Sequence, residues 1–256
     1  MGRDLTKEEL TKHKDEALSR IGDYIDSLID SSDKKIRGKA DKLSYWLEDW
    51  TTFLDFESYF SPSSLRRYKR GEIIKAHLGY NVGSEEGGLH YCVVIDKNNS
   101  KNSPVITVVP LTSVKAKTDL AHLHLGNIYI GNELFTNLNS KISYTDKILT
   151  SRLCELRECI DTLTADTPLD QRKQIRSDLN MCERDLDLLK RMRNEVSKMK
   201  IGSIALVCQM RTISKIRIYD PKTNYDILSG VKLSNEKLDL IDKEILHNFT
   251  GTKNQK

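Results

Sequence analysis

The chain has 256 residues, of which 38% are hydrophobic and 30% are charged, and its formal net charge is +4. This composition is typical of a soluble globular protein with long exposed helices. No apolar run approaches the ~20 residues of a membrane span, and the charged N-terminus lacks the apolar core of a signal peptide, so we expect a cytoplasmic protein without membrane association.

The N-terminal part, residues 1–62, is predicted to be a helical extension. Apolar residues recur at helical spacing over about Thr6–Phe60, and Ser31-Ser32-Asp33 divides the pattern into two helices. Trp46 and Trp50 lie on one face of the second helix. We expect both to pack against a neighbouring surface, because aromatic pairs at this spacing usually bury.

Short strand-like runs dominate the second part of the sequence. They are rich in Val, Ile and aromatic residues, and turns rich in Gly and Asn separate several of them. Several short strands with polar connections indicate a small antiparallel barrel. The predicted strands are Glu72–Leu78, His90–Asp96, Val105–Leu111, Ala121–Ile130, Gly202–Gln209 and Met210–Ile218.

A helical hairpin is predicted to interrupt these strands over residues 146–199. Apolar residues follow a four-three spacing on both sides of Thr167-Pro168. The charges of the hairpin nearly balance, so we expect a stalk packed on itself, with an interaction or dimerisation surface as the alternative. The strands on either side assign residues 63–145 and 200–256 to one α+β domain, which ends in a predicted helix, Asn235–Asn248.

The five cysteines are predicted to be reduced and buried. Their number is odd, none forms a C-x-x-C pair, and they fall on apolar positions, so the spacing fits neither zinc nor disulfides. No Asp/Glu set with metal-ligand spacing and no phosphate-binding Gly loop accompanies the strands, so no metal or other cofactor is expected. The cysteines are Cys92, Cys154, Cys159, Cys182 and Cys208.

Positive charge gathers at two places in the sequence. Clustered positive charge attracts a phosphate backbone irrespective of base sequence. A solvated basic surface explains either cluster about equally well. The first cluster consists of Arg66, Arg67, Lys69 and Arg70, and the second consists of Arg211, Lys215 and Arg217.

The strongest local signal is a series of motifs in the strand region. Lys69-Arg70-Gly71-Glu72 opens the first strand, and Gly83-Ser84-Glu85-Glu86-Gly87-Gly88 forms a loop before an apolar strand. Val109-Pro110-Leu111-Thr112-Ser113 ends the next strand. In this order and spacing the sequence resembles the MazF/PemK family of toxin endoribonucleases. The later segment Gly202–Arg217 resembles the closing element of the same family.

The resemblance implies a small SH3-like antiparallel barrel, a homodimer, and a toxin that a cognate antitoxin neutralises. It further implies metal-independent, sequence-specific cleavage of single-stranded RNA, here mRNA, by attack of the ribose 2′-OH on the adjacent phosphate. Such chemistry needs a group that takes the 2′-OH proton, a group that protonates the leaving 5′-oxygen, and donors for the extra charge on phosphate. The 2′-OH requirement selects RNA over DNA.

Mapped onto this sequence, the resemblance assigns catalysis to His90, Thr112 and Glu85. Thr112 matches the threonine that contacts the scissile phosphate, and Glu85 matches the loop glutamate. His90 is a departure, because most well-known members have arginine there. A histidine can bind phosphate as a cation and can also exchange a proton near neutral pH, so base, acid and phosphate clamp all stay open. The residues expected to contact RNA are Arg67, Lys69, Arg70, Ser84, Tyr91, Ser113, Gln209 and Arg211, of which the last two also fit a dimer interface.

Two further interpretations of the same motifs stay open. A non-catalytic toxin with this barrel, of the CcdB type, relies on an aromatic C-terminal end, which Thr250–Lys256 does not provide. An RNA-binding adaptor would bind RNA without cleaving it. His90 could then simply begin a buried strand, and Thr112 could be an ordinary β-branched strand residue. The presence of both residues favours catalysis.

Overall fold

The computed structural model describes residues 4–251 of a chain that divides into two compact units. The first unit comprises Met1–Phe60 and Leu78–Gly88, and the second comprises Ser61–His77 and Leu89–Lys256. Among residues 4–251, no helix is both long enough and apolar enough to cross a membrane.

Two helices, α1 (Lys7–Ile29) and α2 (Lys34–Glu57), make up most of the first unit. Thr6 begins α1 with a capping box: its hydroxyl accepts from the Glu9 amide at 3.2 Å, and its own amide donates to the Glu9 carboxylate at 2.8 Å. Asp33 caps the start of α2 with its carboxylate. The two predicted helices and the break between them are confirmed.

The two tryptophans of α2 differ in burial. Trp46 is partly buried, with its ring beside Gly79 and its centroid 6.2 Å from that of Phe53. Trp50 is 44% exposed. The expectation of burial is therefore wrong for Trp50, because a small helical unit has too little surface to cover every apolar side chain.

An antiparallel sheet of seven short strands forms the centre of the second unit. The strands follow the order β4-β5-β3-β2-β1-β7, and β6 pairs with β3 off this path. Helices and an antiparallel sheet together confirm the predicted α+β class. The strands are β1 (Ile73–His77), β2 (Leu89–Val94), β3 (Val105–Ser113), β4 (Asn127–Gly131), β5 (Ser203–Leu206), β6 (Arg211–Ser214) and β7 (Ile218–Asp220).

The predicted strand Ala121–Ile130 is wrong over its first half. Strand pairing begins only at Asn127, whose amide donates to the His124 carbonyl at 3.0 Å in a turn. Gly126 lies inside this turn with a φ of 77°, a conformation that glycine adopts without steric cost. The alternation of His and Leu before Asn127 therefore belongs to a loop.

The segment after β5 reaches two edges of the sheet without closing it. The predicted strand Met210–Ile218 is interrupted by a 3-10 turn at Lys215–Arg217. As a result β6 pairs with β3, whereas β7 pairs with β1. In the described part of the chain no pairing joins β7 to β6 or to β4. The antiparallel sheet is therefore shown, but the predicted closed barrel is not confirmed.

The main hydrophobic core lies where the sheet meets helix α5 (Asn235–Phe249) and the first turns of α3 (Glu133–Asp161). The hydroxyl of Ser234 caps α5, which confirms the predicted C-terminal helix. The side chains of this core include Ile73, Val93, Val109, Leu111, Ile130, Leu134, Leu138, Leu238 and Ile241.

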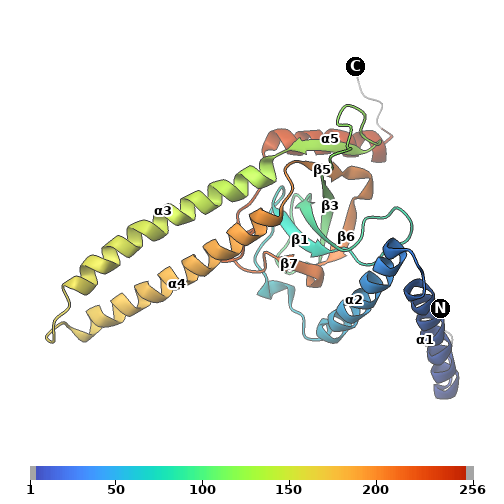
Figure 1. Cartoon of the computed structure of the whole chain (residues 1–256), viewed down its shortest axis with the longest axis horizontal. Coiled ribbons are helices and arrows are strands. Elements are labelled where there is room, and N and C mark those ends of the chain that lie inside the picture. Colours follow the sequence, from blue (N-terminus) through green and yellow to red (C-terminus); the bar gives the residue numbers. More distant parts are fainter. Residues whose placement is uncertain (1–3, 252–256) are drawn as a thin grey trace. The chain divides into compact units, whose positions relative to one another are not determined.

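Helices α3 and α4 (Leu169–Lys198) form the predicted antiparallel hairpin, which extends away from the sheet (Figure 1). Leu149, Leu156 and Cys182 pack between the two helices, and an ion pair joins Arg152 to Asp185 at 2.5 Å. Helix α3 begins at Glu133 rather than near residue 146, because its first turns already contribute to the core of the sheet. The hairpin belongs to the same compact unit as the sheet.

The cysteines are only partly as predicted. All five are free thiols, but only Cys92 and Cys182 are buried. Cys154, Cys159 and Cys208 are exposed. The expectation of burial is wrong for these three, because apolar spacing in a two-helix stalk or a short turn does not guarantee a covering neighbour.

Candidate functional site

The facing ends of β2 and β3 hold two of the predicted catalytic residues. The strand register pairs Cys92 with Pro110. Because paired residues share a face of the sheet and faces alternate along a strand, His90 and Thr112, two positions farther on, lie on that same face. Beyond Pro110, β3 pairs with β5, where Thr112 is opposite Ile204. Both His90 and Thr112 are partly exposed.

A hydrogen bond fixes the ring of His90. Its Nδ1 lies 3.2 Å from the carbonyl oxygen of Leu111, the residue before Thr112. A carbonyl oxygen only accepts, so Nδ1 carries the proton of this bond. In the neutral ring Nε2 is then the nitrogen that can take up a proton.

Ser84 and Glu85 are exposed residues of a glycine-rich loop in the first unit. The loop is closed by two bonds, from the Leu78 amide to Gly88 O at 2.8 Å and from the Gly88 amide to Gly79 O at 2.7 Å. His90 and Thr112 belong to the second unit. The catalytic role of Glu85 and the RNA contact of Ser84 stay predictions.

The first basic cluster contains both paired and exposed cations. Arg66 forms a buried ion pair with Glu72 at 2.8 Å. Arg70 donates to the carboxylate of Asp242 and to a backbone carbonyl, so its charge is largely compensated within the protein. Lys69 and Arg67 are both exposed. Of the three predicted RNA-binding cations here, Lys69 and Arg67 are the more available.

Gln209 ends the 3-10 turn Val207–Gln209, and Arg211 is the first residue of β6. The Arg211 guanidinium donates to the Gln209 side chain at 3.5 Å and to its carbonyl at 3.4 Å. Burial lowers the pKa of nearby Arg217, and the positive charge of Arg211 lowers it further. Lys215, by contrast, is fully buried and donates to the Ser100 carbonyl at 2.9 Å. Lys215 therefore holds the backbone inside the protein, whereas an RNA-binding lysine is expected to be exposed to solvent.

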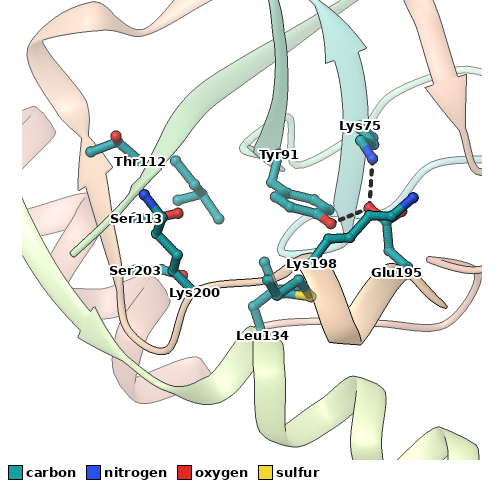
Figure 2. Close-up of a pocket in the computed structure, with 11 residues that line it drawn as sticks. Lys75, Tyr91, Thr112, Ser113, Leu134, Glu195, Lys198, Lys200 and Ser203 are labelled. Atoms are coloured by element: carbon teal, nitrogen blue, oxygen red, sulfur yellow. Dashed lines mark hydrogen bonds and ion pairs between the residues drawn. The ribbon is translucent and has the colours of Figure 1, made fainter. Parts of the chain in front are cut away.

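A cavity of about 240 Å³ opens beside Thr112, where the end of α4 meets the sheet (Figure 2). Two predicted RNA-contacting residues, Tyr91 and Ser113, line it together with Thr112. Its other lining residues are Lys75, Leu111, Leu134, Glu195, Lys198, Met199, Lys200 and Ser203. The cavity therefore collects side chains from strands β1, β2, β3 and β5, from both hairpin helices, and from the residues that follow α4.

Glu195 of α4 holds two strand residues at this cavity. Lys75 and Tyr91 are paired across β1 and β2, and both donate to the same oxygen, Oε1 of Glu195, with a Lys75 distance of 2.5 Å. The Lys75 ammonium also lies 5.3 Å from the centre of the Tyr91 ring. The network joins the hairpin to the sheet.

The hydrogen bonds and charges of this network change the pKa values of Glu195 and Tyr91. Burial alone raises the pKa of Glu195, but the hydrogen bonds from Lys75 and Tyr91 and the charges of Lys75 and Lys198 outweigh it, so the pKa lies below its ordinary value. Burial, followed by the hydrogen bond to Glu195, raises the pKa of the Tyr91 hydroxyl. The carboxylate is therefore charged and the phenol protonated near neutral pH.

No sequence motif indicates a role for Glu195, Lys198 or Lys200. They lie about 120 residues beyond Lys75 in the sequence, at the end of a hairpin whose charges balance. The antiparallel pairing of β1 with β2 accounts for the proximity of Lys75 to Tyr91. No residue spacing in the sequence connects Lys75 or Tyr91 to the end of α4.

Among the described residues, no group of three or more His, Cys, Asp or Glu side chains is placed to hold a metal ion.

Residues 69–177 match the model of the PemK-like, MazF-like toxin of type II toxin–antitoxin systems. The matched range contains β1 to β4, all of α3 and the first turns of α4, and it includes His90 and Thr112. The segment Gly202–Arg217 lies outside it, so its likeness to a closing element stays a prediction. No curated protein matches the chain.

Proposed function

We propose that the chain, whose residues 69–177 match the PemK-like, MazF-like toxin family, is an endoribonuclease toxin. It cleaves single-stranded RNA at a short sequence without a metal ion. The 2′-OH loses its proton and attacks the adjacent phosphate, and the bond from phosphorus to the 5′-oxygen breaks. The leaving 5′-oxygen takes a proton from water, so the products end in a 2′,3′-cyclic phosphate and a 5′-hydroxyl. The observation that carries the proposal is that His90 and Thr112 lie on the same face at the facing ends of β2 and β3.

His90 acts as the general base in this proposal. The bond from Nδ1 to the Leu111 carbonyl leaves Nε2 as the proton-accepting atom of the neutral ring. A base that takes the 2′-OH proton as the oxygen attacks contributes about 10²- to 10⁴-fold to such a reaction. The hydrogen bond also fixes the orientation of the ring, which favours a base over a mobile phosphate clamp.

Thr112 donates its hydroxyl to the scissile phosphate. Its backbone is held by the pairing with Ile204 of β5, so the hydroxyl position is fixed by the sheet before RNA binds. Donors that are fixed in advance stabilise the extra negative charge that develops on phosphate. Glu85 keeps its proposed role as a third member of the site.

The match to a toxin family of type II toxin–antitoxin systems supports an antitoxin partner. As part of the same proposal, residues 63–145 and 200–256 form an SH3-like barrel domain, to which residues 1–62 and 146–199 are additions. This domain forms a homodimer. The protein acts on mRNA in the cytoplasm. Lys69 and Arg67 supply non-specific attraction to the RNA backbone.

The test is to map RNA ends after incubation of the purified protein with a mixed single-stranded RNA in EDTA. We expect fragments with a 5′-hydroxyl and a cyclic phosphate at a shared short sequence. The His90→Ala variant, checked by circular dichroism for an unchanged fold, should leave the RNA intact. Binding of RNA without cleavage by the wild type would instead support an RNA-binding adaptor.

A further inference from the structure

The cavity beside Thr112 has two chemically different ends (Figure 2). Hydroxyl groups and one ammonium group gather at the first end, and the Glu195 network occupies the second. The remaining lining side chains are apolar. Members of the first end are Thr112, Ser113, Ser203 and Lys200, members of the second are Lys75, Tyr91, Glu195 and Lys198, and Leu111, Leu134 and Met199 are the apolar residues.

The first end has the chemistry of an anion site. Lys200 is exposed, and within residues 4–251 it forms no ion pair. In Figure 2 its side chain extends toward Ser113 on the same side as Thr112. A lysine ammonium without an acidic partner, beside serine and threonine hydroxyls, is suited to a phosphate group.

The second end has the chemistry of a base-recognition site. Both internal hydrogen bonds of Glu195 go to Oε1, so within the described part of the protein Oε2 accepts none. A charged carboxylate can accept from the exocyclic amino group of a nucleobase. The ring of Tyr91 and the thioether chain of Met199 offer apolar surface to a planar heterocycle. At about 240 Å³ the cavity is smaller than the ~300–1,000 Å³ of sites for drug-sized ligands, and it suits one nucleotide.

We propose that this cavity binds a single RNA nucleotide next to the scissile phosphate, with the phosphate at Lys200 and an amino-bearing base (adenine, cytosine or guanine) at Glu195. The inference rests on the proposed function and deepens it, because it assigns part of the sequence specificity to named residues. It also gives the hairpin a role: the last turn of α4 and the residue two positions beyond its end supply Glu195 and Lys200.

Tyr91 and Lys75 are positioning residues in this arrangement. They hold Glu195 through Oε1 and keep Oε2 directed to the ligand. Uracil carries a ring N–H but no exocyclic amino group, so it does not offer Oε2 the amino donor that the other three bases provide. A bound base that shields Oε2 from water without this hydrogen bond is disfavoured.

The experiment compares cleavage of a randomised RNA by the wild type, Glu195→Gln and Lys200→Ala. The matched controls are Glu183→Gln and Lys190→Ala, exposed residues of the same helix that do not line the cavity. We expect Glu195→Gln to lower the preference for an amino-bearing base at one position beside the cut by about ten-fold. Lys200→Ala should lower kcat/KM by about ten-fold on all sequences and reduce its salt dependence. The controls should match the wild type.

A second measurement separates this inference from the proposed function. The four nucleoside 3′-monophosphates are titrated into the wild type and the same variants by calorimetry. Selective binding of the amino-bearing nucleotides, lost in Glu195→Gln, supports the cavity even if the wild type cleaves no RNA. The double variant Lys75→Met/Glu195→Gln removes both charges of the ion pair, and it should show the same loss if the single variant is unstable.

Unchanged cleavage sequence and rate in both cavity variants would overturn the inference and leave the endoribonuclease proposal standing. Failure of the wild type to bind any of the mononucleotides would also overturn it. So would binding of an acidic peptide in their place, because the cavity would then serve a protein partner.

Discussion

The Nδ1 atom of His90 lies 3.2 Å from the carbonyl oxygen of Leu111, the residue that precedes Thr112 in β3. One hydrogen bond thus connects the proposed base directly to the strand that carries the proposed phosphate donor. The separation of the two functional groups depends on sheet pairing, which holds catalytic geometry more tightly than a loop does.

Replacing His90 tests whether it acts as a base or as a cation. His90→Ala should lower the cleavage rate by about 100-fold or more. His90→Arg restores a positive charge but cannot take a proton near neutral pH, so it should be nearly as slow. Single-turnover cleavage of one mapped RNA site measures both variants. A His90→Arg enzyme with near-wild-type rate would show that a fixed cation suffices and that the base lies elsewhere.

Two substitutions of Thr112 separate the contribution of its hydroxyl to the cleavage rate from the contribution of its side-chain shape. Thr112→Val keeps the β-branched side chain that suits the strand, but it removes the donor, so we expect a loss of about 100-fold in kcat. Thr112→Ser keeps the hydroxyl and should stay within about ten-fold of the wild type. Steady-state kinetics with thermal melting as a control measures this series. Equal rates for valine and threonine would remove Thr112 from the site.

The Lys75–Glu195 ion pair predicts a pH-dependent contribution to stability. Its side chains are 20% and 18% exposed, and the pKa of Glu195 is lowered from 4.5 in the folded protein. Since the unfolded chain takes up the proton more readily, the contribution is present above pH 4.5 and is lost as the pH falls below that value through the folded-state pKa.

Urea unfolding of the wild type and Glu195→Gln at about pH 7 and about pH 3 measures this contribution. The difference in unfolding free energy between the two proteins should shrink at the lower pH. A difference that stays constant would show that the carboxylate charge contributes nothing to folding. The exposed Glu183→Gln variant, which lacks such a network, controls for the general effect of removing an acid.

Lys141 of α3 is hydrogen-bonded to the loop that leads toward α5. Its ammonium donates to three carbonyl oxygens, of Asp226 at 3.1 Å, Ile227 at 2.9 Å and Ser229 at 2.7 Å. Lys141→Met keeps the aliphatic stem but leaves these carbonyls without their donor, which should cost about 2 kcal/mol of unfolding free energy. Lys147→Met, at an exposed position of the same helix, should change stability little. Equal denaturation midpoints for the two variants would contradict a stabilising role of these hydrogen bonds.

Local patterns in the sequence determine most of the elements and part of the site. Helical spacing predicts α1, α2, α5 and the hairpin, because amphipathic periodicity is written in neighbouring residues. The motifs also indicate His90 and Thr112, and strand register then places both on one face. The same patterns mislead where local spacing has no covering surface, as at Trp50 and Cys208, or where a glycine turn interrupts alternation, as at Gly126.

Only the tertiary structure decides which distant side chains meet. Glu195 reaches Lys75 and Tyr91 because the hairpin returns to the sheet at the end of α4, and the charge of Arg70 is compensated by Asp242 of α5. Ser84 and Glu85 group with the N-terminal helices, although they precede His90 by only a few residues. Periodicity records which face of an element is apolar, but it does not record what that face packs against. The sequence therefore predicts His90 and Thr112 as site residues, whereas the cavity beside Thr112 comes from long-range packing.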